Sequence, residues 1–412
     1  MPFRRRVLPT VLALTVLAAG CGAKEGGRVQ VKAGPGVTDD TISLGILTDM
    51  TGPYKASAMT RMKGYELYLK QVNDRGGICG RKVELKVKDH AYDVQKALDA
   101  YFELEPQILG LMELVGTPMT TAIEPDIIQT RTLTAPVAWS ASLLGNPHMM
   151  IVGTTYDLDV INGLDYYKRR GIIREGDTVG HIYVQGSYGD NALEGSTFVG
   201  EQWKMNIAKQ PIGETTGDLS QQMAALKAQG AKAIVLSTAP AQTAAAVGVA
   251  AAMKWDVPFM LNIVGYDPAL LDSPVAAAVE KQVSVVTSVA PFTGTQPGPR
   301  EVAAAFSKNY PNDKPALYVD HGYTVAKVFL AVIEKACKNG DLTRDGVLKA
   351  FHDTSGLDTQ GLTGELHYSL VGRPSSTQSY ITKVDRSAPG GLTTVEELFE
   401  SGLVKLKGTR AR

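Results

Sequence analysis

The segment 41–87 reads TISLGILTDMTGPYKASAMTRMKGYELYLKQVNDRGGICGRKVELKV, and it holds the first complete unit of the pattern that decides the fold. Residues 41–47 alternate in polarity and end at a polar turn, which predicts a strand. Apolar residues then recur at helical spacing over 62–72, and Gly76-Gly77 ends that helix. Residues 83–87 alternate again. The segment is therefore a predicted strand–helix–strand unit.

The same alternation continues along the chain. Helices are predicted over 95–106, 119–129, 190–205, 219–226, 243–253 and 325–338, and strands over 108–114, 178–184, 233–236, 259–263, 283–289 and 380–384. Thr343 is the predicted cap of one more helix. A break near 152–157 divides the pattern in two, which predicts two α/β lobes with parallel sheets. Ligands of such sheets bind at the carboxyl ends of the strands, so the cleft between the lobes is the expected site.

The N-terminus indicates export. Arg4, Arg5 and Arg6 precede the apolar run 7–20, which is shorter than the roughly 20 residues needed to cross a membrane and fits a secretory signal. The following LAAGC at 17–21 resembles the bacterial lipobox, in which Cys21 receives a diacylglycerol. The usual leucine three places before the cysteine is replaced by Ala18. The alternative is an ordinary signal peptide with an incidental cysteine.

Composition excludes several classes of protein. The chain carries 42 basic and 42 acidic residues, and this balance without basic runs argues against a nucleic-acid partner. No later apolar stretch reaches membrane-spanning length, so the lipid alone would hold the mature protein, through a flexible linker at 22–37. The six histidines are scattered, and no Walker loop is present. We therefore expect no enzyme activity, no metal and no cofactor.

Two cysteines remain after Cys21. Cys79 lies in the turn GGICG, and Cys337 lies near the end of a predicted helix. In an exported protein they are candidates for one disulfide, and two separate thiols are the alternative.

Several short segments together point to a family. They are ILTDMTGP at 46–53, VNDRGGICGRKV at 72–83, APVA at 135–138, YG at 188–189 and GYT at 322–324. Over residues 38–388 the chain resembles the branched-chain amino acid (Leu/Ile/Val)-type substrate-binding proteins of ABC transporters, which have the type I periplasmic-binding fold.

This resemblance implies a Venus flytrap of two Rossmann-like α/β lobes. Three crossovers join the lobes, and we place them near 153–157, 286–291 and 358–363. Lobe one then comprises 38–154 and 289–360, lobe two comprises 155–288 and 361–388, and 389–412 is a C-terminal extension. Cys79 and Cys337 both fall in lobe one, which permits their disulfide. The family also implies a monomer that closes on its ligand and docks on an ABC permease of the branched-chain amino acid type.

The resemblance also indicates where this pocket departs from the family. Amino acid binders hold the ligand carboxylate with hydroxyls and backbone N–H groups after the third and fourth strands of lobe one. Here Gly116 takes the usual place of a serine, Thr117 follows it, and Trp139 replaces a threonine. Carboxylate capture is weakened but retained, because Thr117, Ser140 and backbone amides remain.

The partners for a ligand ammonium are missing from their family positions. Ile263 takes the place of the acidic residue, and Ala239 falls near the place of a tyrosine. A buried ammonium without a carboxylate costs several kcal/mol. We therefore expect walls without negative charge and a solute less zwitterionic than leucine, isoleucine or valine, with an apolar or aromatic body on Trp139 and Tyr188.

The candidate ligand-binding residues are those at predicted strand ends and helix starts, and each has a structural role in the core or at the surface as its alternative. They are Tyr54, Ser57, His90, Gly116, Thr117, Val137, Ala138, Trp139, Ser140, Tyr188, Thr238, Asn262, Tyr266 and Tyr323.

The function that follows is an exported lipoprotein on the outer face of the cytoplasmic membrane. It would deliver an amino acid-like molecule, an amide or a small or aromatic carboxylate to an ABC importer. An extracytoplasmic sensor with the same fold is the alternative, and a lipoprotein hydrolase is a remote one.

Overall fold

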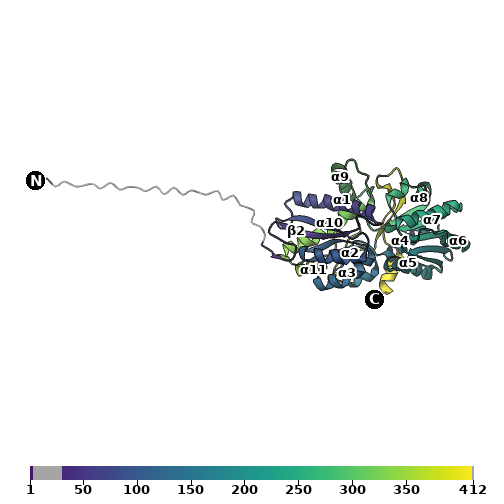
Figure 1. Ribbon diagram of the computed structural model, residues 1–412, viewed down its shortest axis with the longest axis horizontal. Helices are drawn as coiled ribbons and strands as arrows, with labels where there is room; N and C mark the ends of the chain where they lie inside the picture. The colour runs from purple at the N-terminus through teal and green to yellow at the C-terminus, as the bar shows by residue number, and fades with distance from the viewer. Residues whose placement is uncertain (3–29, 411–412) are drawn as a thin grey trace.

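The computed structural model describes residues 1–2 and 30–410, so the predicted signal segment and Cys21 lie outside the described residues. Two α/β lobes lie side by side (Figure 1). Of the described helices, none is long and apolar enough to cross a membrane.

Lobe one is built on a four-stranded parallel sheet. Its strand order is β3 (Lys82–Asp89), β2 (Thr41–Thr48), β4 (Gly110–Val115) and β5 (Thr134–Val137). Both faces are covered, which is why β2 and β4 are almost continuously buried. The helices of this lobe are α1 (Lys55–Asp74), α2 (Val94–Leu104), α3 (Thr117–Thr130), α9 (Pro297–Asn309), α10 (Leu317–Lys338) and α11 (Arg344–His352).

Helices α1 and α10 pack closely through two glycines. A Cβ on Gly64 would lie 2.2 Å from the carbonyl oxygen of Val319, and one on Gly322 would lie 2.1 Å from that of Arg61. Helix α10 begins at Leu317, two turns before the predicted start at residue 325. The first turns are buried on all sides, so they lack the polar face from which a helix is read in sequence.

Lobe two has a seven-stranded sheet. Its order is β13 (Leu392–Phe399), β12 (Ser379–Val384), β10 (Val283–Thr287), β9 (Phe259–Asn262), β8 (Ala233–Ser237), β6 (Thr178–Val184) and β7 (Asn206–Ile212). The five strands from β10 to β7 are parallel, while β12 and β13 are antiparallel to their neighbours. The segment predicted as an extension beyond residue 388 thus supplies the edge strand β13 of lobe two.

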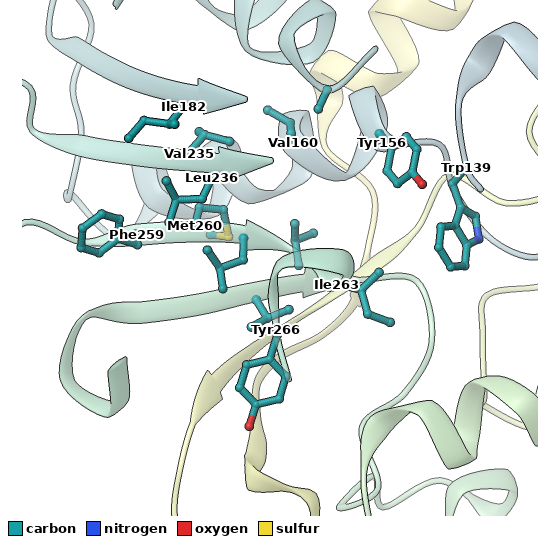
Figure 2. Packing of buried hydrophobic residues seen from close by; sticks show 14 of the residues in the cluster. Trp139, Tyr156, Val160, Ile182, Val235, Leu236, Phe259, Met260, Ile263 and Tyr266 are labelled. Atoms are coloured by element: carbon teal, nitrogen blue, oxygen red, sulfur yellow. The ribbon is translucent and has the colours of Figure 1, made fainter. Parts of the chain in front are cut away.

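Helices cover the lobe-two sheet on both faces. They are α4 (Tyr156–Arg169), α5 (Ser187–Trp203), α6 (Ser220–Ala228), α7 (Pro240–Ala252), α8 (Ala276–Gln282) and α12 (Gly402–Arg410). Figure 2 shows the core between strands and helices, where Ile182, Val235, Leu236, Phe259 and Met260 pack together. This core continues without interruption toward Trp139 and Tyr156 at the lobe boundary.

The chain crosses between the lobes three times. The first two crossings lie between β5 and α4 and between β10 and α9. The third comes later than the predicted 358–363, because Leu366 and Tyr368 pack in the core of lobe one. After them Ser375 lies against the first crossing, where its hydroxyl donates to the carbonyl oxygen of Ile151 at 2.7 Å.

A disulfide joins Cys79 to Cys337, with their Cα atoms 6.1 Å apart. It ties the turn before β3 to the end of α10. The predicted linker also takes part in the fold, because β1 (Lys32–Ala33) pairs with β11 (Asp341–Leu342) on the outside of lobe one.

Candidate functional site: a pocket between the lobes

A pocket of about 680 Å³ lies between the lobes, and we call it the interlobe pocket. Loops at the carboxyl ends of strands from both sheets form its walls, which is where ligands bind in open α/β sheets. Its lining consists of Pro53, Tyr54, Ser57, Arg61, Ala91, Tyr92, Val115, Gly116, Thr117, Pro118, Thr121, Ala122, Val137, Trp139, Tyr156, Val184, Gln185, Gly186, Ser187, Tyr188, Glu214, Thr215, Ala239, Gln242, Val264 and Tyr318.

Half of the sequence-predicted candidates line this pocket. They are Tyr54, Ser57, Gly116, Thr117, Val137, Trp139 and Tyr188. Six of the seven come from lobe one, because strand ends are easiest to locate in sequence where the first strands and turns are most regular.

Four lobe-one candidates lie outside the lining. His90 is fully buried, and its Nδ1 accepts a hydrogen bond from the backbone N–H of Tyr92 at 3.0 Å. The Ala138 side chain packs in the core, and the Ser140 hydroxyl accepts from the N–H of Ser142 at the start of a 3₁₀ turn. The Tyr323 hydroxyl donates to a side chain of α1, because its position follows the pocket-facing start of α10 by more than a turn.

Three lobe-two candidates also lie outside the lining. The Thr238 hydroxyl is bonded to that of Thr243 at 3.1 Å. The side-chain oxygen of Asn262 accepts from the Ser237 hydroxyl, so the amide is used inside the lobe. The Tyr266 hydroxyl donates to the carbonyl oxygen of Gly391 at 3.0 Å, and Figure 2 shows the ring turned away from Trp139.

A tight loop after β2 positions the first wall. The carboxylate of Asp49 accepts hydrogen bonds from the backbone N–H groups of Gly52 and Tyr54, which fixes the turn into α1. The Tyr54 ring then lies 4.7 Å from the Tyr92 ring, centroid to centroid. Burial raises the pKa of Tyr54 to about 12, so its hydroxyl is neutral at physiological pH.

The glycine at position 116 is required by the geometry. Its φ is +96°, a conformation that side-chain-bearing residues rarely adopt. A Cβ there would lie 2.2 Å from Cε of Met119 and 2.8 Å from the Tyr92 ring. The loop that carries a serine in the family is therefore shaped here around an aromatic neighbour.

Aromatic rings form the wall where the lobes meet. The ring centroids of Trp139 and Tyr156 are 5.9 Å apart, and those of Tyr156 and Tyr188 are 4.6 Å apart. The Trp139 indole donates to the carbonyl oxygen of Val152 at 3.2 Å, which fixes its orientation. The Tyr188 hydroxyl is buried without a hydrogen-bond partner among the described residues. This wall suits a flat or apolar body with one polar group.

A buried ion pair lies at the floor of the pocket. Arg61 is 1% exposed, and its Nε donates to Oε2 of Glu113 at 2.9 Å. The same oxygen accepts from the Tyr65 hydroxyl at 2.5 Å. Nη2 of Arg61 is buried and has no partner among the described residues. The guanidinium lies 5.6 Å from the ring centroid of Tyr318.

Two helices direct their amino ends at the pocket without a side-chain cap. Helix α3 follows Gly116, and α5 follows Gly186, and neither glycine carries an acceptor for the first-turn N–H groups. Such free N–H groups and the helix dipole favour an anion. Among the described residues, no cluster of three or more metal-ligating side chains is found.

Sequence reasoning missed five important lining residues. Tyr92 lies two residues after the candidate His90, and Arg61 lies one helical turn after the candidate Ser57, so the pattern that selected those candidates comes close to both. Tyr156 and Tyr318 lie at helix starts that were not located in sequence. Glu214 corrects the expectation of walls without negative charge, although its side chain is exposed on the loop after β7.

Comparison with known proteins decides the family. The model of a family described as periplasmic binding protein matches residues 41–389. The chain belongs to this family. A structure named as a fatty acid ABC transporter substrate-binding protein from Thermomonospora curvata is 38% identical, with a TM-score of 0.88, over 91% of this chain and 96% of the other.

Two more distant matches are one relative in sequence and one solved structure. The Leu/Ile/Val-binding protein homolog 3 of Brucella melitensis is 25% identical over 368 residues, which cover 85% of this chain and 93% of the relative. A branched-chain amino acid ABC transporter structure from Thermus thermophilus with bound valine has a TM-score of 0.78 at 17% identity, over 91% of this chain and all of the other.

The relatives also fix the class of protein. They are extracytoplasmic binding proteins that serve ABC transporters rather than enzymes, so the remote hydrolase alternative is set aside. This periplasmic binding protein has the two-lobed type I fold that the sequence predicted.

Proposed function

We propose that this periplasmic binding protein is a lipoprotein that captures a carboxylate with an apolar body and delivers it to an ABC permease. The single observation that carries the proposal is the lining of the interlobe pocket. Its rings and aliphatic side chains surround a space entered by two uncapped helix amino ends. An anionic head fits the helix ends, and an apolar body fits the rings.

A free amino acid fits this lining less well. Glu113 is already paired with Arg61, and the one acidic side chain on the lining, Glu214, is solvent-exposed. An exposed carboxylate contributes at most about 1 kcal/mol to an ion pair, which does not offset the desolvation of an ammonium. Ile263, at the family's acidic position, is buried outside the lining.

Fatty acids are a natural first test of this class. The protein from Thermomonospora curvata, which is named for fatty acids, is 38% identical in sequence to this chain. We extend that substrate class to this chain as part of the proposal, together with aromatic acids such as phenylacetate.

A thermal-shift screen tests the ligand class. The ligands are linear fatty acids from butyrate to hexadecanoate, phenylacetate, leucine and valine. A true ligand at 100 times its Kd stabilises the folded protein by about 2.7 kcal/mol. We expect the largest shift from a fatty acid or phenylacetate. The proposal is wrong if leucine or valine gives the largest shift.

The anchor is tested separately. Labelled palmitate should be incorporated into the protein in cells, and Cys21→Ala should abolish the label and release the protein from the membrane fraction. Retention of Cys21→Ala in that fraction would contradict lipid anchoring.

A further inference from the structure

The guanidinium of Arg61 is incompletely used by the protein itself. It offers five N–H donors in a planar fork. Within the described residues, Nε donates to Oε2 of Glu113, and Nη2 is buried without an acceptor. A buried charged donor without a partner is costly, so native structures supply one.

Among the described residues, no group lies within hydrogen-bond distance of Nη2, although Oε1 of Glu113 is also buried without a partner. The Tyr318 ring offers its face, with the centroid 5.6 Å from the guanidinium carbon. The imidazole of His321 is also close enough for the positive charge to act on it, and both its nitrogens lack a partner among the described residues. Burial, with the charge of Arg61, lowers the pKa of His321 to about 3, so this ring is neutral and adds no negative charge.

Arg61 nevertheless lines the interlobe pocket, so a ligand can reach it. The Glu113 side chain, which holds Nε, is 0% exposed and does not line the pocket. The tie from Tyr65 to Glu113 and the pairing with Nε fix the plane of the fork from behind. The fork is therefore held in place by these contacts, and its Nη2 remains unpaired.

We propose that Arg61 binds the ligand carboxylate through its η nitrogens and is the residue that selects an anionic head. The inference rests on the proposed function, since it names the protein group that holds the head of an apolar-bodied carboxylate. The head then lies on lobe one at the pocket floor, and the apolar body extends toward Trp139, Tyr156 and Tyr188 on the lobe boundary. Glu113 is a positioning residue, because it orients Arg61 and does not touch the ligand.

The test compares an anion with its uncharged isostere. Octanoate and octanamide have the same apolar chain and differ in the charge of the head, as do phenylacetate and phenylacetamide. Calorimetric titration of each pair gives the ratio of their affinities. In the wild type we expect the acid to bind about 10- to 100-fold more tightly than the amide, the range of a charge-assisted hydrogen bond.

The informative variant removes both buried charges together. Arg61→Met with Glu113→Gln leaves no unpaired carboxylate, and the glutamine oxygen can still accept from Tyr65. We expect the acid-to-amide ratio to fall to about 1 while the amide affinity changes little. Arg61→Lys keeps the charge and its pairing with Glu113 but loses the fork, so we expect about a tenfold weaker acid affinity.

The chain offers a matched control in the same lobe. The Arg344 side chain is 10% exposed and is paired with a glutamate, Glu105, and it lies outside the pocket lining. Arg344→Met with Glu105→Gln should retain the wild-type acid-to-amide ratio. This control separates loss of the carboxylate-binding arginine from loss of an arginine–glutamate ion pair in general.

The outcomes separate the two proposals. If fatty and aromatic acids bind the wild type and the Arg61 variants keep the wild-type acid-to-amide ratio, the proposed role of Arg61 is wrong, while the proposed ligand class stands. Such a result would assign the carboxylate to the amino ends of α3 and α5. If none of the acids binds the wild type, the proposed ligand class fails, and the proposed role of Arg61 fails with it.

Discussion

The buried carboxyl of Asp159 provides a quantitative test of the hinge. It lies in the first turn of α4 and is 4% exposed. Its Oδ1 accepts from the hydroxyl of Thr154, in the first crossing, at 2.6 Å and from that of Ser379, at the start of β12, at 2.7 Å. Burial raises the pKa of Asp159 from 3.8 to about 6, although both hydroxyls favour the charged form.

This shift has a definite sign and size. In the unfolded chain the carboxyl loses its proton near pH 4, whereas in the folded protein it holds the proton until about pH 6. The folded state therefore binds more protons between these values, so stability is lost as pH rises from about 4 to 6 and stays reduced above that. Two pKa units at 1.36 kcal/mol each correspond to about 3 kcal/mol.

Asp159→Asn should remove this loss. The asparagine oxygen can accept both hydroxyls, and the side chain has no charge to desolvate. We expect the free energy of unfolding of the variant, minus that of the wild type, to rise by about 3 kcal/mol between pH 4 and pH 7. Urea unfolding of both proteins at each pH measures this difference.

A second substitution should enlarge the pH-dependent loss of stability instead of removing it. Thr154→Val removes one donor to the charged carboxylate, so it should raise the pKa of Asp159 further and extend the loss of stability above pH 6. A difference between Asp159→Asn and wild type that stays flat from pH 4 to 7, or that favours the wild type at neutral pH, would refute the reasoning.

Three further substitutions test the packing of lobe one and the pocket. Trp139→Ala should cost about 3–5 kcal/mol of stability by creating a cavity, and it should abolish the thermal shift from the true ligand; an unchanged shift would show that the ligand does not contact this ring. Cys79→Ser with Cys337→Ser releases a closure spanning 258 positions, so urea unfolding should show a loss of about 5.5 kcal/mol by the chain-entropy relation, and no loss would contradict it. Gly116→Ala forces a side chain into a φ of +96° and toward Met119, so we expect a loss of about 1–3 kcal/mol in the same measurement, and an alanine as stable as glycine would disprove the strain.

The sequence was sufficient for most of the fold because its buried strands are short, apolar and bounded by turn residues. Strand β6 was predicted with its observed bounds, and Thr343 caps α11 as predicted, since its hydroxyl accepts from the N–H of Gly346. The failures have physical causes. The start of α10 has no polar face, and β13 is a half-exposed edge strand whose polar residues give no clear period.

The candidate site was predictable only where it is made by loops that follow strands. Thr117, Trp139 and Tyr188 each follow the end of a predicted strand, and all three line the pocket. Arg61 is different, because it lies within α1, and its burial depends on a carboxylate supplied by β4, 52 positions away. No local pattern distinguishes such an arginine from the solvated cations of an ordinary amphipathic helix.

The charges around the pocket favour a monocarboxylate over a zwitterion. Arg61 and Glu113 cancel at the floor, so the remaining field there comes from the amino ends of α3 and α5, which is positive. A carboxylate head gains from this field and from the free side of the Arg61 fork. An ammonium on the same ligand would be repelled by both, and its nearest available carboxylate on the lining is the exposed Glu214. A molecule with one negative head and an apolar remainder therefore supplies a partner for the free side of the Arg61 fork, whereas an amino acid leaves its ammonium without a buried partner.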